Sequence, residues 1–262
     1  MAELDTIQSL WVRGPLSTLE RLSIQSFLAH GHPYRLYVYD EVPNVPDGVE
    51  VRDADAVVPR SRIFTYQTEG IGKGSLSGFS NLFRYTLLAR EGGWWCDTDV
   101  VCLRPFAFDA PSLIASSYER KWGDAANNCV MRAVPGDPVL TYCRDAFERF
   151  DVATLKMAKS GPNLVQEAIR EVGVGETVVP AHVFCPVSWR HTRFLVAPRS
   201  AVAWYNVKRL LRGGERIGGA GPDSFAVHLW TNMWRNAGLD KDASYARSSL
   251  FERLKRHYLL DE

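Results

Sequence analysis

The sequence predicts an α/β protein in which a layer of strands is covered by helices. Short apolar segments of strand type alternate with amphipathic segments of helical period, and elements that alternate in this way pack as α/β layers. With 262 residues, of which 46% are hydrophobic, the chain can bury a sizeable core. Because no repeat or linker divides the sequence, we expect a single domain over residues 1–262.

The N-terminal elements carry clear start signals. Residues 6–12 are rich in apolar side chains and predict a first strand. Ser17 and Glu20 have the spacing of a capping box, which predicts a helix from there to Ala29. The aromatic and aliphatic residues at 34–40 predict a half-buried strand.

The middle of the chain contains a loop, a helix and a strand in close succession. Residues 69–78 are rich in glycine and predict a loop. Phe79, Leu82 and later apolar residues recur at helical spacing and predict a helix at 79–91 that stops at Gly92. The other expected strands are 94–96, 100–103, 112–117, 128–133, 177–185 and 225–230, and the other expected helices are 137–149, 162–171 and 245–259.

Composition excludes several classes of protein. An aromatic content of 11% with balanced charge excludes disorder as a description of the whole chain. The 31 Lys and Arg residues face 30 Asp and Glu residues, for a net charge of +1. A protein that binds nucleic acid through its phosphates normally has a basic excess, so nucleic acid is not an expected partner.

Neither a membrane span nor a disulfide framework is expected. The N-terminal residues lack a basic leader followed by an apolar segment, and no apolar run approaches the ~20 residues of a membrane helix. The five cysteines are odd in number and contain no C-x-x-C pair, so we expect reduced thiols and no zinc ribbon. These features favour a cytoplasmic protein.

Asp97-Thr98-Asp99, at the end of an apolar strand, is the most informative segment. Side chains at i and i+2 of an extended chain point to the same face, so the two carboxylates should converge. Buried carboxylates need a cation, an arginine or a proton, and their oxygens suit Mg²⁺ or Mn²⁺. An acidic pair that only caps a turn or helix explains the same spacing. The three residues alone leave both interpretations open.

One context for this pair is a phosphatase of the haloacid-dehalogenase type. Residues 97–101 fit its D-x-D-x-[TV] pattern, in which the first Asp is a nucleophile and the second a general acid or base. That fold usually begins at the motif strand, whereas here the motif follows other elements. Gly123-Asp124 and Gly136-Asp137 both lack the second acid of the expected metal cluster. The phosphatase is therefore the less supported alternative.

Two segments carry a resemblance to a different family. Residues 80–85 are S-N-L-F-R-Y, and residues 92–99 are G-G-W-W-C-D-T-D. They resemble the D-x-D sugar-nucleotide glycosyltransferases of the family 32 type, with capsular polysaccharide and clostridial-toxin relatives, whose pattern is S-D-x-x-R-Y followed by G-G-x-Y-x-D-x-D. Asn81 replaces the usual Asp and Trp95 the usual Tyr. The resemblance covers most of the chain in order, although only this central block is highly specific.

The resemblance implies a GT-A fold, which is a Rossmann-like mixed sheet flanked by helices. It also implies a metal-dependent hexosyltransferase that moves a sugar from a nucleotide-diphosphate sugar to an acceptor hydroxyl with retention of configuration. Mn²⁺ or Mg²⁺ is the expected cofactor, and a glycan or glycolipid is the expected acceptor in surface polysaccharide or glycolipid synthesis. We expect a cytoplasmic location with a peripheral contact at the inner face of the membrane.

The same resemblance assigns residues to the site. Asp97 and Asp99 are expected to hold the metal, with His228 as a third ligand. Independently of the resemblance, the glycine-rich segment 213–221 is either a plain surface loop or a lid that orders over the bound donor. No catalytic nucleophile is identified. The residues expected at the nucleotide sugar are Leu10, Trp11, Asn81, Arg84, Trp95, Asn128 and Trp230, and those expected to meet the diphosphate are Arg209, Arg212 and Arg216.

Each assignment has an ordinary structural alternative. Arg84 can be a solvated charge on a helix, and Trp11 and His228 can be core residues. For the whole protein, a sugar-nucleotide or glycan binding module without turnover is the main alternative, because Asn81 keeps hydrogen bonding but supplies no charge.

Overall fold

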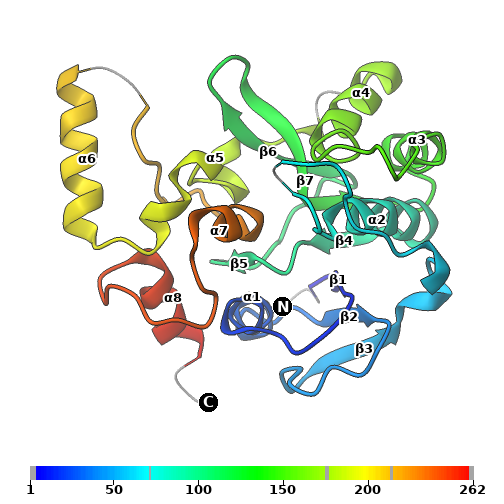
Figure 1. Cartoon of the computed structure of the whole chain (residues 1–262), viewed down its shortest axis with the longest axis horizontal. Helices are drawn as coiled ribbons and strands as arrows, with labels where there is room; N and C mark the ends of the chain where they lie inside the picture. Colours follow the sequence, from blue (N-terminus) through cyan, green and yellow to red (C-terminus); the bar gives the residue numbers. More distant parts are fainter. Residues whose placement is uncertain (1–3, 71, 175–176, 213–214, 260–262) are drawn as a thin grey trace.

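The computed structural model describes residues 4–70, 72–174, 177–212 and 215–259, and it is built around a six-stranded sheet (Figure 1). In the order of the sheet, its strands are β3 (Val49–Asp53), β2 (Tyr34–Val38), β1 (Ile7–Trp11), β4 (Gly93–Cys96), β7 (Gly123–Ala133) and β6 (Leu113–Glu119). The first four are parallel to one another, β7 is antiparallel to β4, and β6 is antiparallel to β7. The predicted α/β class with a mixed sheet is confirmed.

Helices cover both faces of this sheet. Trp94 and Trp95 are neighbours on β4 and therefore point to opposite faces, where each joins a different core. The helices on the Trp95 face are α2 (Ser77–Glu91), α3 (Pro138–Phe147) and α4 (Pro162–Val172), and those on the Trp94 face are α1 (Thr18–Ala29) and α5 (Ala181–Phe184). The capping box that predicts α1 is present, with Ser17 as N-cap and Glu20 bonded back to it.

A second, two-stranded sheet joins the C-terminal region to the rest of the fold. β5 (Val100–Cys102) follows β4 closely and pairs in antiparallel orientation with β8 (Ala226–His228). Val101 and Val227 pack in a third core with Trp234 and Phe251, which come from α7 (Thr231–Ala237) and α8 (Leu250–Tyr258). The pairing of β5 with β8 brings residue 228 next to residue 99, more than a hundred positions away in the sequence.

The strand expected at 177–185 is wrong. This segment forms one isolated bridge, between Val178 and Ile114, and then the short helix α5. Pro180 is the N-cap of that helix, and a proline has no N–H to continue a strand ladder. The hydrophobic run alone does not distinguish a strand from a short buried helix.

Three other helices differ from the expectations, and one of them, α7 (Thr231–Ala237), is not among the expected helices. The expected helices also do not include α6 (Arg199–Arg212), in which no residue is fully buried and Val202 and Tyr205 pack, partly buried, against the third core. The helix expected at 245–259 begins later, at Leu250, where Ser249 caps it by accepting a hydrogen bond from the backbone of Glu252. Within the described parts of the chain, no helix is long and apolar enough to cross a membrane.

The turn from α2 into β4 requires glycine. Gly92 has φ 67° and ψ −155°, a backbone conformation that essentially only glycine adopts. A Cβ atom at this position would lie 2.7 Å from the carbonyl oxygen of Ala133 and 2.8 Å from the nitrogen of Pro135. Since Asp97 follows only five residues later, this turn fixes where the acidic pair begins.

We expect Gly92→Ala to lower the free energy of unfolding by about 3 kcal/mol, because backbone strain and a backbone clash occur together. Gly136→Ala is a matched control: Gly136 also has a positive φ, 79°, but a Cβ there meets nothing within 4 Å. It should cost about 1 kcal/mol. Urea unfolding of both variants measures the difference, and equal losses would contradict the role of the Gly92 turn.

Candidate functional site

The candidate site lies at the carboxyl ends of β1 and β4. β2 and β3 extend the sheet from one side of β1, while β4 lies on its other side, so the chain order reverses between β1 and β4. In open α/β sheets, ligands bind outside the carboxyl ends of the strands at such a reversal. β1 ends at Trp11, and Asp97 directly follows β4.

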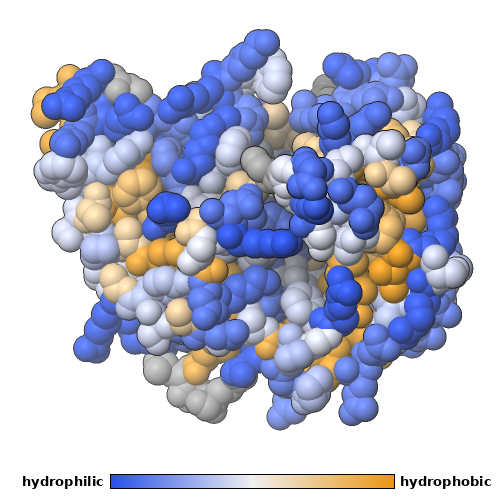
Figure 2. All heavy atoms as spheres, viewed as in Figure 1, coloured by the Kyte–Doolittle hydropathy of each residue, from blue (hydrophilic) through white to orange (hydrophobic). Residues whose placement is uncertain are grey.

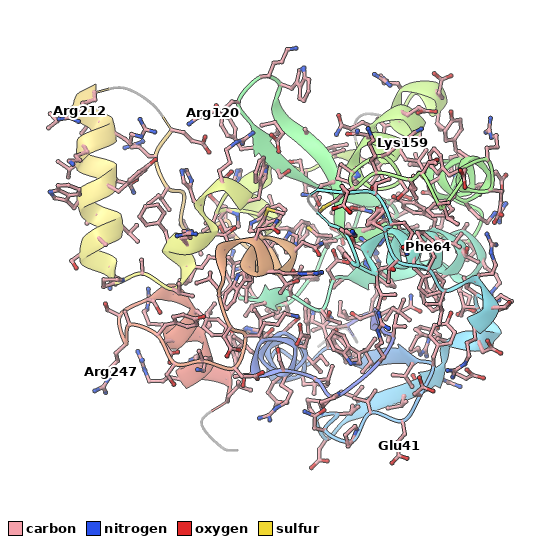
Figure 3. The ribbon with its side chains drawn as sticks, in the orientation of Figure 1. Glu41, Phe64, Arg120, Lys159, Arg212 and Arg247 are labelled. Carbon is pink, nitrogen blue, oxygen red and sulfur yellow. The ribbon has the colours of Figure 1, made fainter. Side chains whose placement is uncertain are left out.

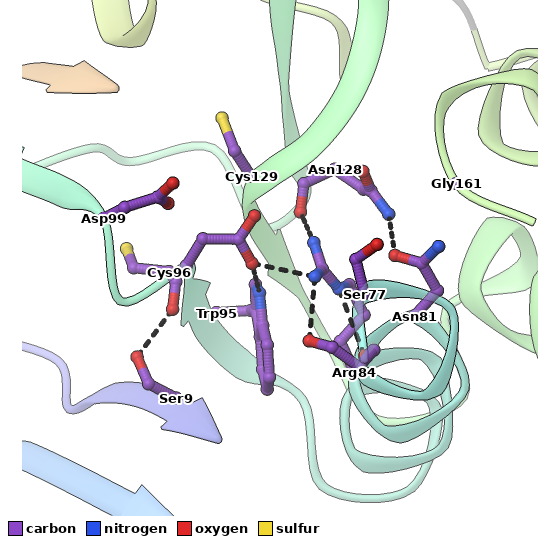
Figure 4. A network of polar contacts seen from close by, with 12 residues as sticks. Ser9, Ser77, Asn81, Arg84, Trp95, Cys96, Asp99, Asn128, Cys129 and Gly161 are labelled. Carbon is purple, nitrogen blue, oxygen red and sulfur yellow. Dashed lines mark hydrogen bonds and ion pairs between the residues drawn. The ribbon is translucent and has the colours of Figure 1, made fainter. Parts of the chain in front are cut away.

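Asp97 is held by three contacts from its own surroundings. Its backbone N–H donates to the carbonyl of Cys129 at 2.8 Å. Its Oδ1 accepts from Nη2 of Arg84 at 2.8 Å and from Nε1 of Trp95 at 3.0 Å (Figure 4). These bonds fix one carboxylate oxygen. The side chain remains 25% exposed, so it can be reached from solvent.

Arg84 is an internal counter-charge and not a solvated helix charge. Its side chain is 3% exposed, and its guanidinium carbon lies 4.8 Å from the centroid of the Trp95 ring. Besides Asp97, the guanidinium donates to the carbonyl of Asn128 and to the hydroxyl of Ser80. In this structure, the arginine therefore orients Asp97 and has no face turned to solvent.

Asn81 and Asn128 meet beside this pair. Nδ2 of Asn128 donates to Oδ1 of Asn81 at 2.8 Å, and Nδ2 of Asn81 donates to the hydroxyl of Ser160 at 3.2 Å. The Tyr85 hydroxyl accepts from Asn128 at 3.1 Å and donates to the carbonyl of Ser160 at 2.9 Å. Gly161 lies so close that an added Cβ would be 3.1 Å from Nδ2 of Asn81. Neither Tyr85 nor Ser160 is among the predicted site residues.

Asp99 is anchored by the chain that follows β8. Its Oδ1 lies 3.1 Å from Nε2 of His228, and its Oδ2 accepts from both the backbone N–H and the hydroxyl of Thr231 at 2.8 Å. Trp230 between them has φ 60° and ψ 51°, a left-handed conformation that is rare for a bulky residue. This turn directs Thr231 toward Asp99. Thr231 is not predicted from the sequence, because its position depends on the pairing of β5 with β8.

The structure brings Asp97, Asp99 and His228 together. One ligand atom from each lies within 4.8 Å of the others. Two carboxylate oxygens and an imidazole nitrogen form a donor set that suits a divalent cation such as Mn²⁺. Because Arg84, Trp95 and Thr231 already orient the carboxylates, the residues present fit such an ion.

The protonation of these groups follows from burial and mutual charge. Burial raises the pKa of Asp97, and Arg84 opposes that rise. Burial also acts to raise the pKa of Asp99, but His228 and the hydrogen bonds from Thr231 outweigh it and hold that pKa well below its usual range. For His228, burial acts to lower the pKa, and Asp99 overcomes this effect and raises it to about 10. Without a metal, Asp99 and His228 thus form an ion pair.

The aromatic residues predicted at the nucleotide, and Leu10 beside them, differ in how much of each side chain is exposed. Trp95 is 1% exposed and Leu10 is buried in the same core, so neither offers a free face for stacking. Trp11 is partly exposed at the end of β1, and its Nε1 donates to the carbonyl of Gly14. Trp230 is partly exposed and lies against His228, with ring centroids 3.9 Å apart.

Among the described residues, no hydrogen bond or ion pair joins the predicted lid arginines to Asp97 or Asp99. Arg209 bonds to Tyr205 on its own helix, and Arg212 is at the end of α6, on the opposite side of the molecule from α2 (Figure 3). Arg216 is exposed in the segment that follows. Residues 213–214 of the predicted lid lie outside the described residues.

The pocket found near the end of β1 is not lined by the acidic pair. Its walls include Arg13, Phe64, Gln67 and Leu76. Asp99 and His228 are each 7% exposed, so the candidate metal site is a buried cluster reached from the side of Asp97.

No family model and no curated protein sequence matches this chain. Among solved structures, PaToxG glycosyltransferase is similar over 98% of this chain and 85% of its own, with 14% identity and a TM-score of 0.46. The glycosyltransferase GlyE of Streptococcus pneumoniae TIGR4 is similar over 91% of this chain and 61% of its own, with 10% identity and a TM-score of 0.43. Identities and TM-scores this low do not support a functional assignment, which therefore has to be argued from the residues of the site.

The contact between Arg84 and Asp97 can be tested by its effect on stability. We expect Arg84→Ala to lower the free energy of unfolding by about 3 kcal/mol, because it leaves a largely buried carboxylate without its cation. Adding Asp97→Asn should recover much of this loss, since the unpaired charge is then gone. Urea unfolding of the single and double variants measures the coupling.

Arg62→Ala is the matched control, because Arg62 pairs with Glu148 in an exposed ion pair with side chains 41% and 51% exposed. It should cost at most about 1 kcal/mol. If Arg84→Ala is no more harmful than Arg62→Ala, Arg84 is not the counter-charge of Asp97.

Proposed function

We propose that the protein is a metal-dependent glycosyltransferase that moves a sugar, in the manner of a hexosyltransferase, from a nucleotide-diphosphate sugar to an acceptor hydroxyl. The observation that carries this proposal is the meeting of Asp97, Asp99 and His228 where the order of the sheet reverses. The segments that resemble D-x-D glycosyltransferases contribute Asn81, Arg84 and the acidic pair to the same place.

Asp97 and Asp99 would hold the cation, with Nε2 of His228 as the third donor. Mn²⁺ is the proposed ion, with Mg²⁺ as the other candidate. Such an ion supplies positive charge that stabilises a departing diphosphate. A neutral His228 can offer a lone pair, whereas a protonated His228 can only donate to Asp99.

The remaining residues of the site would orient the ligand. Arg84 and Trp95 keep Oδ1 of Asp97 in place, which leaves its Oδ2 for the ligand side. Asn81 and Asn128 are 6% and 7% exposed and bond to each other, so a sugar hydroxyl would have to replace one of their present bonds, which an amide allows because it both donates and accepts. Trp11, partly exposed at the end of β1, would stack on the base. Fixed contacts of this kind reduce the entropy lost when donor and acceptor are brought together.

We expect Asp99→Asn and Asp97→Asn to reduce Mn²⁺-dependent sugar release from a panel of nucleotide-diphosphate sugars by about 100-fold or more, because each removes a charge that holds the cation. Both variants are nearly isosteric, and circular dichroism checks that they fold. Asp47→Ala, which changes an exposed acid far from the site in the sequence, should retain full activity.

Wild-type activity in Asp99→Asn, or activity unaffected by chelation, would contradict the metal role. Donor binding without any product over a long incubation would favour the binding module instead. Release of phosphate from simple phosphomonoesters would favour the phosphatase. The anomeric configuration of the product, measured by nuclear magnetic resonance, tests the proposed retention.

A peripheral membrane contact is proposed through α6. Trp204, Val207 and Leu211 share one face of this helix and are 61%, 55% and 79% exposed. Among its fourteen residues α6 has basic side chains, including Lys208, and no acidic one. Hydrophobic atoms lie among hydrophilic ones along this left edge of the molecule (Figure 2). An exposed helix that combines apolar and basic residues matches the chemistry of an anionic lipid surface, where a glycolipid acceptor would reside.

We expect the double variant Trp204→Ser, Leu211→Ser to bind vesicles containing phosphatidylglycerol at least about tenfold more weakly, since it removes two apolar side chains that would enter the lipid interface. Co-sedimentation measures this binding, which should also weaken as salt rises. Val51→Ser on the edge strand β3 changes an apolar residue that is 50% exposed and lies outside α6, and should have no effect. Equal binding of all three proteins would contradict the role of α6.

A further inference from the structure

Two buried cysteines form a second cluster of metal-binding side chains with His228. The Sγ atoms of Cys129 and Cys185 lie 3.5 Å apart, and these atoms and a nitrogen of His228 all lie within 4.8 Å of one another. The three residues are 2%, 3% and 7% exposed. The proposed glycosyltransferase chemistry uses neither cysteine.

The three side chains come from separate elements that hold them in place. Cys129 lies within β7, His228 ends β8, and Cys185 follows α5, where its backbone N–H donates to Ala181 at 2.7 Å. Asn127 connects both cysteines. Its Oδ1 accepts from the backbone N–H of Cys129 at 2.9 Å, and its Nδ2 donates to Sγ of Cys185 at 3.6 Å. The fold thus presents the cluster on a rigid frame.

His228 directs an unpartnered nitrogen toward this frame. Its Nε2 faces Asp99 at 3.1 Å, whereas its buried Nδ1 makes no hydrogen bond of ordinary geometry to any described residue, and the ring interacts on this side with the thiol of Cys185. A buried polar nitrogen without a partner is costly and calls for an explanation. Histidines that bind a metal through one nitrogen almost always donate from the other to a carboxylate, which is the arrangement of His228 with Asp99.

We propose that Cys129, Cys185 and Nδ1 of His228 form a zinc site. Thiolate and imidazole are the ligands that Zn²⁺ prefers in proteins. Two Zn–S bonds of about 2.3 Å at a tetrahedral angle separate the sulfurs by about 3.8 Å, close to the 3.5 Å observed here. Two thiolates also neutralise the ion, so the buried site carries no net charge.

A thiolate, and not a thiol, is the form that binds metals. The cluster has three members among the described residues, which leaves the fourth position of a tetrahedral ion to water.

The zinc site does not depend on the proposed glycosyltransferase activity, although the two sites share one imidazole. A neutral imidazole has a single free lone pair, so zinc on Nδ1 keeps the proton on Nε2, where Asp99 accepts it. In the zinc-loaded protein, Mn²⁺ would therefore be held by Asp97 and Asp99 without His228.

The first test is the metal content of the full chain. Protein prepared under reducing conditions is incubated with Zn²⁺ and dialysed, and its metal content is measured by inductively coupled plasma mass spectrometry. We expect about one tightly held zinc ion per wild-type chain and a loss of that zinc in Cys129→Ser and Cys185→Ser. Cys143→Ser is the matched control, because Cys143 is also fully buried but lies on α3, outside the cluster. Zinc that is absent from the wild type, or retained in Cys185→Ser, overturns the proposal.

The second test uses Co²⁺ in place of zinc and needs no change to a buried cysteine. Thiolate ligation gives a charge-transfer absorption band that carboxylate ligation does not give. We expect this band in the wild type and in Asp97→Asn, because Asp97 belongs to the group with Asp99 and His228 and not to the group that contains the cysteines. The absence of the band from the wild type overturns the zinc site. If Asp97→Asn keeps the band but loses sugar transfer, the zinc site is shown to be independent of the glycosyltransferase activity.

Discussion

The burial of Asp99 and the partial burial of Asp97 at the tip of a strand are the constraint on which the rest of this site depends. Asp97 and Asp99 follow a strand whose residues belong to two hydrophobic cores, and Asp99 itself is 7% exposed. Charge in such a place must be balanced, since removal from water costs several kcal/mol per ion. The fold provides one cation for each acid, Arg84 for Asp97 and His228 for Asp99.

These two cations have different consequences for binding a metal. Arg84 cannot lose its proton, so it stays as a fixed charge that orients Oδ1 of Asp97 whatever else is bound. His228 can change between proton donor and lone-pair donor, so it can respond to an ion. The charge beside Asp97 is therefore fixed, whereas the charge beside Asp99 can change with the protonation of His228. His228 also connects the acids to Cys129 and Cys185, which makes it the residue shared by all the metal chemistry proposed for this protein.

The surroundings of the site are organised by backbone as much as by side chains. The Gly92 turn starts β4 in its proper place, and the left-handed Trp230 turns Thr231 toward Asp99. Backbone strain of this kind persists only where the surrounding structure holds it. Here the pairing of β5 with β8 and the packing of Trp234 supply that support. Helix α6 packs Val202 and Tyr205 against the core that contains Trp234, and it leaves Trp204, Val207 and Leu211 exposed to another surface.

The sequence by itself determined the local features. The capping box of α1, the amphipathic α2, the glycine turn and the adjacent acids each depend on residues close together in the chain, so their spacing predicts them. Tertiary structure alone decided that Arg84 faces inward, that Thr231 holds Asp99 and that Cys129 meets Cys185. It also decided that residues 181–184 are helical, since a short apolar run fits a strand or a helix equally well. The physical reason is that such contacts join distant segments, and their geometry is set by strand pairing and packing that local patterns do not encode.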